Sequence, residues 1–299
     1  MLTKELGQTG VRIPEVGMGT WNYHAGPVPL RRGLEAGASF IDTAESYGTE
    51  PTIGQAIQGL RHHAFIATKV SPQNFRRTDL RRSVDSSLRR LGVETIDLLQ
   101  LHAPNPAVSL QETLGAIGEL VEEGKIRFIG VSNFSVSQLM AARQAAPDKH
   151  PIVSNQIRYS IVDRAIEKEM LPYCRANGIT VIAYSPLAES WNRIRECDPQ
   201  GSVAAMAYDT GKSPAQIVIN WCLCKDNVVA IPKANSAERI LENFGAAGWR
   251  LSVDEIARLD RAIRYRQRGR VYDLARTCLP RPVRHLALRV IQGLRPQLL

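Results

Sequence analysis

The chain has 299 residues, of which 44% are hydrophobic and 22% are charged. This composition supplies enough apolar side chains for a large core and excludes a disordered or collagen-like protein. The net charge of +9 is concentrated at one end, because residues 261–299 hold ten arginines and one acid, whereas residues 1–260 hold 28 basic and 28 acidic residues. A neutral body argues against a nucleic-acid-binding fold.

Eight short apolar segments rich in β-branched residues predict β-strands. They begin near Glu15, Phe40, Phe65, Ile96, Phe128, Ser154, Thr180 and Val228. Helical spacing lies between several of them, over 80–91, 110–123 and 213–224, and the last helix has Ser213 as its N-cap and Pro214 in its first turn. Eight alternating units in about 250 residues favour a closed (β/α)8 TIM barrel over an open dinucleotide-binding sheet.

Three further segments surround this predicted barrel. Residues 2–14 predict a hairpin that could plug the bottom of the barrel, and residues 188–211 form a long excursion, either a flexible lid or an ordered surface loop. We expect two domains, the barrel over 1–263 and an Arg-rich extension over 264–299. Apolar spacing after Pro282 predicts a short amphipathic helix there, which could contact an anionic membrane or an acidic protein, although packing on the barrel is the favoured interpretation.

The sequence shows no signal for secretion, membrane insertion, a disulfide framework or a metal site. The first residues contain no apolar core of a secretory signal, and no run approaches the about 18 apolar residues of a membrane span. Five scattered cysteines do not suggest a disulfide framework, and nothing completes a metal site around Cys222 and Cys224. We therefore expect a cytoplasmic protein without a bound metal.

Four chemically distinctive side chains follow three consecutive predicted strands. Asp42 and Tyr47 follow the second strand, Lys69 ends the third, and His102 ends the fourth. Catalytic groups of (β/α)8 barrels project from these strand ends. Each residue alone is more often structural than catalytic, but four at one rim predict a shared site.

The chemistry expected of this group is proton transfer to a carbonyl oxygen as a hydride reaches the carbon. Asp42 would neutralise Lys69, and the Lys69 ammonium would lower the pKa of Tyr47. His102 would share the proton or hold a substrate oxygen. A Schiff-base aldolase acting through Lys69 is a less favoured alternative, because Asp42 and Tyr47 would keep the lysine charged.

The chain resembles the aldo-keto reductases from about Thr3 to Asp260. The motifs that carry the resemblance are Gly17-Met18-Gly19-Thr20-Trp21, Asp42-Thr43-Ala44 with Tyr47-Gly48, Thr68-Lys69, Leu101-His102, Gly130-Val131-Ser132-Asn133-Phe134, Asn155-Gln156, Ala183-Tyr184-Ser185-Pro186-Leu187 and Ile231-Pro232-Lys233. The resemblance implies a (β/α)8 barrel that reduces aldehydes and ketones with a nicotinamide cofactor. It implies a catalytic tetrad of Asp42, Tyr47, Lys69 and His102, with Tyr47 as the general acid.

The same resemblance implies a set of cofactor contacts. Ser132, Asn133 and Gln156 would bind the nicotinamide carboxamide, and the Tyr184 ring would stack on the nicotinamide. Lys233 and Arg239 would hold the adenosine 2′-phosphate, which favours NADPH, with NADH as the alternative. The remaining implied contacts are Thr20, Trp21, Asp42, Ser185, Pro186, Leu187, Ile231, Ala234, Glu242 and Asn243. Ala234 stands where many members have serine.

The expected substrate is a small carbonyl compound held at the barrel mouth. The residues expected to line this mouth are Trp21, Tyr23, His24, Tyr47, His102 and Trp191, with Asn105 as a further candidate. Ala103 replaces a tryptophan of larger members, which predicts a more open mouth. A non-enzymatic alternative is an NADP-binding regulatory subunit whose basic tail contacts a partner.

Overall fold

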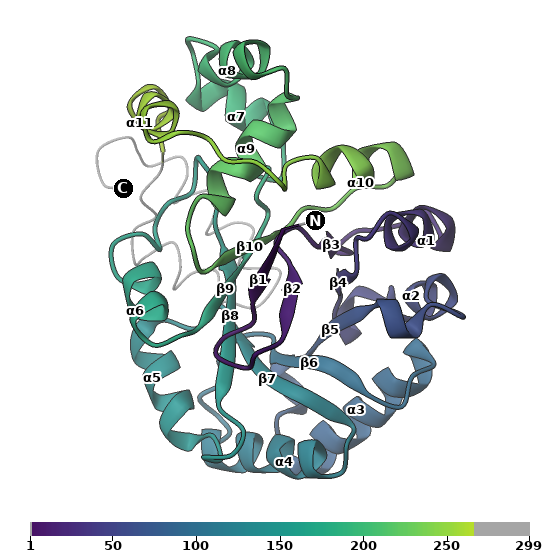
Figure 1. Cartoon of the computed structure of the whole chain (residues 1–299). Coiled ribbons are helices and arrows are strands. Elements are labelled where there is room, and N and C mark those ends of the chain that lie inside the picture. The colour runs from purple at the N-terminus through teal and green to yellow at the C-terminus, as the bar shows by residue number, and fades with distance from the viewer. Residues whose placement is uncertain (1, 266–299) are drawn as a thin grey trace, which may run out of the picture.

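The computed structural model describes residues 2–265, and its centre is an eight-stranded parallel sheet (Figure 1). The strands are β3 (Met18–Gly19), β4 (Phe40–Asp42), β5 (Phe65–Val70), β6 (Ile96–Leu101), β7 (Ile126–Ser132), β8 (Ile152–Arg158), β9 (Thr180–Tyr184) and β10 (Val228–Ile231). Each strand pairs with its sequence neighbour, and a parallel bridge between Val16 and Ala230 joins the two ends. The predicted (β/α)8 barrel is confirmed.

The barrel closes at its shortest strand. This strand is β3, the first strand of the barrel, and it begins at Met18, later than the predicted start near Glu15. Residues just before it still pair with β10, because Gly17 N–H donates to the carbonyl of Ala230 over 2.8 Å. A Cβ on Gly17 would lie 2.6 Å from the Phe40 ring, and one on Gly19 would lie 2.6 Å from the carbonyl oxygen of Ile231. Gly17 therefore leaves room for the Phe40 ring, and Gly19 allows the close backbone approach to β10 that completes the barrel.

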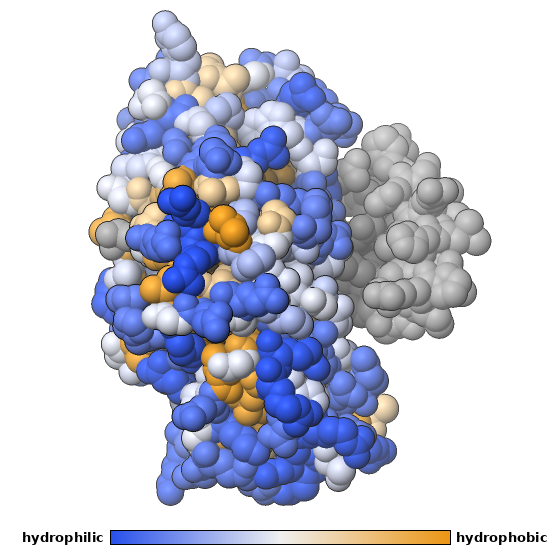
Figure 2. All heavy atoms as spheres, turned by 90° about the vertical axis from the view of Figure 1, so that its right-hand side faces the viewer, coloured by the Kyte–Doolittle hydropathy of each residue, from blue (hydrophilic) through white to orange (hydrophobic). Residues whose placement is uncertain are grey.

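Helices surround the strands on the outside (Figure 1). They are α1 (Pro27–Glu35), α2 (Glu50–Ala56), α3 (Arg77–Leu91), α4 (Leu110–Glu122), α5 (Val136–Ala145), α6 (Met170–Ala176), α9 (Pro214–Leu223), α10 (Ala237–Phe244) and α11 (Val253–Ala262). The predicted cap of α9 is present, since Ser213 accepts a hydrogen bond from Gln216 N–H. The outer face beside α1 and α10 is mostly hydrophilic, with separate apolar patches (Figure 2).

The hairpin formed by β1 (Thr3–Glu5) and β2 (Arg12–Pro14) closes one end of the barrel, as predicted. Its Leu6 and Ile13 are fully buried in the cluster that fills the barrel interior. Lys4 Nζ donates to the carbonyls of Leu223, Lys225 and Val228 over 2.7, 2.7 and 2.8 Å. These contacts bind the hairpin to the end of α9 and the start of β10.

The long excursion is ordered as two helices, α7 (Trp191–Cys197) and α8 (Ser202–Thr210). The side chain of Asp198 accepts hydrogen bonds from the N–H groups of Ser202 and Val203, both 2.8 Å long, at the start of α8. Helix α8 packs against α9 and α11. Of the two interpretations of this segment, the ordered one agrees with the structure.

Most of the predicted extension lies outside the described residues. This applies to the amphipathic helix after Pro282, and the division into domains at 263 and 264 stays a prediction. Within residues 2–265, no helix is both long and apolar enough to cross a membrane. Three short 3-10 turns complete the elements: η1 (Glu45–Tyr47), η2 (Arg61–His63) and η3 (Pro72–Asn74).

Candidate active site

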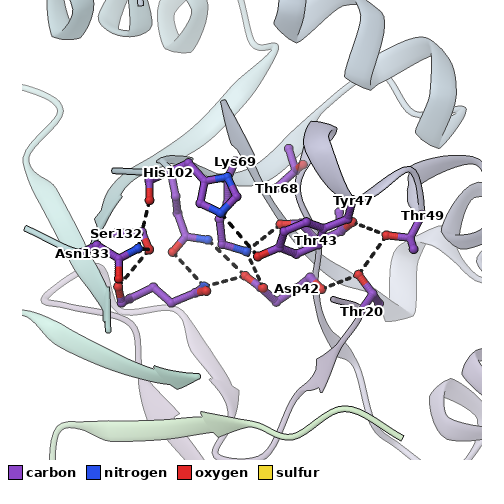
Figure 3. Close-up of polar contacts among 12 residues, drawn as sticks. Thr20, Asp42, Thr43, Tyr47, Thr49, Thr68, Lys69, His102, Ser132 and Asn133 are labelled. Atoms are coloured by element: carbon purple, nitrogen blue, oxygen red, sulfur yellow. Dashed lines mark hydrogen bonds and ion pairs between the residues drawn. The ribbon is translucent and has the colours of Figure 1, made fainter. Parts of the chain in front are cut away.

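The carboxyl ends of β4, β5 and β6 bring four polar side chains together (Figure 3). Asp42 is the last residue of β4, Lys69 is next to last in β5, and His102 follows β6. Tyr47 reaches the same place from the turn η1, which is followed by Gly48 with a φ of 72°. The structure thus places Asp42, Tyr47, Lys69 and His102 around one point at the barrel rim.

A buried ion pair forms the base of this group. Lys69 Nζ donates to Asp42 Oδ1 over 2.6 Å and to the carbonyl of Thr43 over 2.7 Å. The two side chains are 1% and 3% exposed. Burial favours the neutral amine, but Asp42 and Tyr47 together outweigh it and raise the pKa of Lys69. Lys69 is therefore a charged ammonium at neutral pH.

The phenol of Tyr47 lies over this ion pair. The Tyr47 hydroxyl is 3.5 Å from His102 Nε2, and Lys69 Nζ is 4.9 Å from the centre of the Tyr47 ring. Burial raises the pKa of Tyr47, and the opposing effect of Lys69 does not overcome it. The expectation of a lowered pKa was therefore wrong, because desolvation of the phenolate exceeds the attraction of the ammonium.

His102 is neutral in this environment. Burial, assisted by the positive charge of Lys69, lowers the pKa of His102 to about 3. A neutral imidazole offers one N–H donor and one lone pair. His102 can therefore hold a substrate oxygen by a hydrogen bond, whereas a cationic imidazolium that donates a proton is excluded near neutral pH.

The residues expected to bind the nicotinamide lie beside this group. Asn133 Nδ2 donates to the carbonyl of His102 over 3.1 Å and to Ser132 Oγ over 3.0 Å. Asn133 Oδ1 accepts a hydrogen bond of 2.9 Å from the Tyr184 hydroxyl. Gln156 Nε2 donates to Asp42 Oδ2 over 2.6 Å. The ends of β7, β8 and β9 are thus connected to the ends of β4 and β6.

The segment after β9 has an unusual backbone. Ser185, Ala188 and Glu189 have φ values of 53°, 58° and 65°, a left-handed conformation that non-glycine residues rarely adopt. Arg158, at the end of β8, forms an ion pair with Glu189, and its guanidinium lies 5.5 Å from the centre of the Tyr184 ring. The ion pair holds a backbone that is costly in isolation.

The expected phosphate-binding residues lie at the start of α10. Lys233 and Arg239 are exposed, and within residues 2–265 neither forms an ion pair. Ser236 caps α10 by accepting from the N–H of Arg239. Two unpaired cations beside a helix N-terminus fit a phosphate group. The adjacent expected contacts are buried at Ile231, Ala234 and Asn243, and Thr20 Oγ1 donates to the carbonyl of Asp42 over 2.9 Å.

The residues expected at the mouth differ in their surroundings. Trp21 is 54% exposed and Trp191 is 37% exposed, so both can contact a ligand. Tyr23 is buried, and its hydroxyl donates to the carbonyl of Gly26 over 2.7 Å. His24 Nε2 lies 3.2 Å from Asn235 Nδ2. Asn105 donates to the carbonyl of Pro72, which anchors it at the rim.

Three polar residues that the sequence did not single out support the site. Glu45 accepts hydrogen bonds of 2.6 and 2.9 Å from Ser71 N–H and Asn74 Nδ2, which fixes the turn that carries Tyr47. Gln100 contacts Asp42, and Arg158 contacts the segment after β9. The sequence signal for the last two is their spacing: Gln100 lies two residues before His102, and Arg158 lies two residues after Gln156, so each pair lies on one face of an extended segment.

The fold and this rim define a (β/α)8 barrel with a cluster of titratable side chains at its strand ends. The model of the aldo/keto reductase family matches residues 15–264. The chain therefore belongs to the aldo/keto reductase family, and it is an oxidoreductase. Within residues 2–265, no cluster of three or more His, Cys, Asp or Glu side chains could hold a metal ion.

Individual relatives agree with this membership. Methylglyoxal reductase YeaE of Escherichia coli is 34% identical over 262 residues, which cover 84% of this chain and 92% of the relative. A thermostable aldo-keto reductase solved with the inhibitor epalrestat is 40% identical, with a TM-score of 0.80 over 88% of this chain and all of that chain. An aldo-keto reductase of Klebsiella pneumoniae, solved with NADP and acetate, is 35% identical, with a TM-score of 0.82 over 89% of this chain and 97% of that chain.

Proposed function

We propose that this enzyme reduces aldehydes or ketones to alcohols with NADPH, and that Tyr47 is the general acid. The observation that carries the proposal is the position of the Tyr47 hydroxyl, between the buried Lys69–Asp42 pair and the neutral imidazole of His102. Solved relatives that contain NADP or NADPH support the choice of cofactor.

The side chains divide the work of proton transfer. The raised pKa of Tyr47 keeps its phenol protonated at neutral pH, which a general acid for the carbonyl oxygen requires. The Lys69 ammonium stabilises the phenolate that remains after the proton has left. His102 holds the carbonyl oxygen within reach of the phenol. When bound, NADPH supplies the hydride that completes the alcohol at the carbonyl carbon.

The cofactor would lie along the ends of β7 to β10. Ser132, Asn133 and Gln156 bind the carboxamide, and the Tyr184 ring supports the nicotinamide. Ser185, Pro186 and Leu187 follow the pyrophosphate. Lys233 and Arg239 hold the 2′-phosphate, and Glu242 and Asn243 lie on the same helix for contact with adenine. These two cations, which form no ion pair within the described part of the chain, are the feature that favours NADPH over NADH.

The substrate class is a small carbonyl compound. Trp21 and Trp191 offer apolar faces, and Tyr47 and His102 offer the polar contacts for a carbonyl oxygen. The similarity to a methylglyoxal reductase makes 2-oxoaldehydes a first class to test.

The Schiff-base alternative is disfavoured by the same contacts. A nucleophilic lysine must be neutral, whereas Asp42 raises the pKa of Lys69 and holds its ammonium. An NADP-binding regulatory subunit would need no buried ion pair under a tyrosine hydroxyl. Carbonyl reduction with Tyr47 as the acid is the interpretation that gives a role to each of the four tetrad residues.

The direct test is NADPH oxidation by the full chain over a set of aldehydes, ketones and quinones, with NADH in parallel. We expect turnover of small aldehydes with a marked preference for NADPH. Binding of NADPH without turnover of any carbonyl compound would favour the regulatory alternative. A borohydride-trapped substrate adduct on Lys69 would instead favour the aldolase.

A further inference from the structure

Gln100 connects the ion pair to the expected nicotinamide site. It lies on β6 two residues before His102 and has no solvent exposure. Its side-chain Nε2 donates to Asp42 Oδ2 over 3.2 Å, on the oxygen that does not bind Lys69. Its Oε1 accepts a hydrogen bond of 3.2 Å from Gln156 Nε2.

These contacts use both donors of Gln156. A glutamine amide carries two N–H donors on nitrogen and an acceptor oxygen. In Gln156 one N–H donates to Asp42 Oδ2 over 2.6 Å and the other donates to Gln100 Oε1. The atom of Gln156 that is left to meet a ligand is therefore its carbonyl oxygen, an acceptor.

The packing around Gln100 restricts it to this arrangement. Gly130 on β7 is its register partner. A Cβ on Gly130 would lie 3.1 Å from Gln100 Cγ and 2.4 Å from Ser154 Oγ. The Gln100 side chain therefore occupies space that a larger residue on β7 would remove, and it has little freedom to turn away from Gln156.

We propose that Gln100 is a positioning residue that holds the Gln156 amide with its carbonyl oxygen towards the dinucleotide, so that the site selects a carboxamide NH2 group. This inference rests on the proposed function, because it assigns Gln156 to the nicotinamide. Without Gln100, the second N–H of Gln156 is released, and Gln156 can donate to a ligand as well as accept from it.

A cofactor analogue separates this role from a general effect on folding. The 3-acetylpyridine analogue of NADP⁺ has a methyl group in place of the carboxamide NH2. Its equilibrium dissociation constant and that of NADP⁺ can be measured by quenching of protein fluorescence, without any turnover. We expect the wild-type chain to bind NADP⁺ about tenfold more tightly than the analogue, because the analogue leaves a buried acceptor without a donor.

The variants Gln100→Leu and Gln100→Met should reduce this tenfold preference to about threefold or less. The two replacements differ in shape, so the test does not depend on how well one of them packs. Ser154→Ala is the matched control, since it removes a buried hydroxyl of the same region that forms no hydrogen bond within residues 2–265.

The outcomes distinguish a failure of the proposed function from a failure of the role of Gln100. If the wild-type chain binds neither NADP⁺ nor NADPH, the proposed function fails, and this inference fails with it. If the wild-type chain binds them but both apolar variants keep the full preference, the proposed function stands and the role of Gln100 is wrong. An equal loss of preference in Ser154→Ala would also contradict it.

Discussion

Burial has opposite effects on the two titratable rings of the site. It raises the pKa of the Tyr47 phenol and lowers that of the His102 imidazole, because in each case it disfavours the charged form. Both rings are consequently neutral at pH 7. The charge of Lys69 is balanced by Asp42, so the rim has no net charge from these four residues until the reaction develops one.

His102 should make the stability of the fold depend on pH. The pKa of His102 is about 3 in the folded chain and about 6.5 when unfolded. The unfolded state binds the proton first, so this contribution is complete above pH 6.5 and is lost as pH falls towards 3. We expect wild type to lose about 2 kcal/mol more unfolding free energy than His102→Gln between pH 7 and pH 5.

Urea unfolding at the two pH values measures this difference. The comparison with His102→Gln removes the contribution of carboxylates, which is common to both chains. Equal losses in the two chains would show that the folded state accepts a proton on His102 near its ordinary pKa.

The sequence identifies the residues of the tetrad more readily than their partners. Asp42, Lys69 and His102 each follow an apolar run, so their position at strand ends can be predicted. The contact between Gln156 and Asp42 joins residues that are 114 positions apart and depends on the curvature of the barrel. The pKa of Tyr47 also depends on burial, which a list of neighbouring charges does not include.

Lys4 is one of several residues that attach the hairpin to the barrel, beside the buried Leu6 and Ile13 and the hydrogen bonds to Thr180. Lys4→Met removes the donor for three backbone carbonyls at the end of α9 and the start of β10. We expect a loss of about 2 kcal/mol in unfolding free energy, since each hydrogen bond contributes about 0.5–1.5 kcal/mol. The rim lies at the other end of the strands, so kcat at 25 °C should change less than twofold.

Denaturant unfolding of Lys4→Met checks this effect. The exposed Lys149→Met is the matched control, and it should unfold as wild type does. If the two variants are equally stable, the hydrogen bonds of Lys4 contribute no net stability to the fold.

The segment after β9 should depend on the ion pair between Arg158 and Glu189. Arg158→Gln removes the charge that holds the left-handed backbone at Glu189. We expect the Kd for NADPH to rise about fivefold and amide exchange over residues 185–190 to accelerate. Arg175→Gln removes an exposed ion pair with Asp226 and should change neither quantity. Unchanged amide exchange in Arg158→Gln would contradict the proposed role of the ion pair.

At the scale of the whole molecule, the alternation of strands and helices was sufficient to predict the barrel. Its eight parallel strands and hairpin are confirmed by the structure. The way the barrel closes was less accessible to prediction, because β3 has only two residues and its pairing continues through an isolated bridge at Val16. Such closure depends on contacts between residues more than 200 positions apart.

The proposed cofactor site extends from the tetrad to α10, so its two ends can be tested separately. The double variant Lys233→Met with Arg239→Met should raise the Kd for NADPH about tenfold, because it removes both cations expected at the 2′-phosphate. The Kd for NADH should change less than twofold, and this serves as the internal control. An equal weakening of both cofactors would contradict the phosphate assignment.

The central claim is that Tyr47 gives its proton to the substrate. Single-turnover reduction of an aldehyde by wild type and Tyr47→Phe, with the Kd for NADPH measured on the same samples, tests it most directly. We predict a fall of at least about 10³-fold in the rate constant, within the range for loss of a general acid, and a Kd within twofold of wild type. A Tyr47→Phe enzyme that reduces the aldehyde at the wild-type rate would contradict the account.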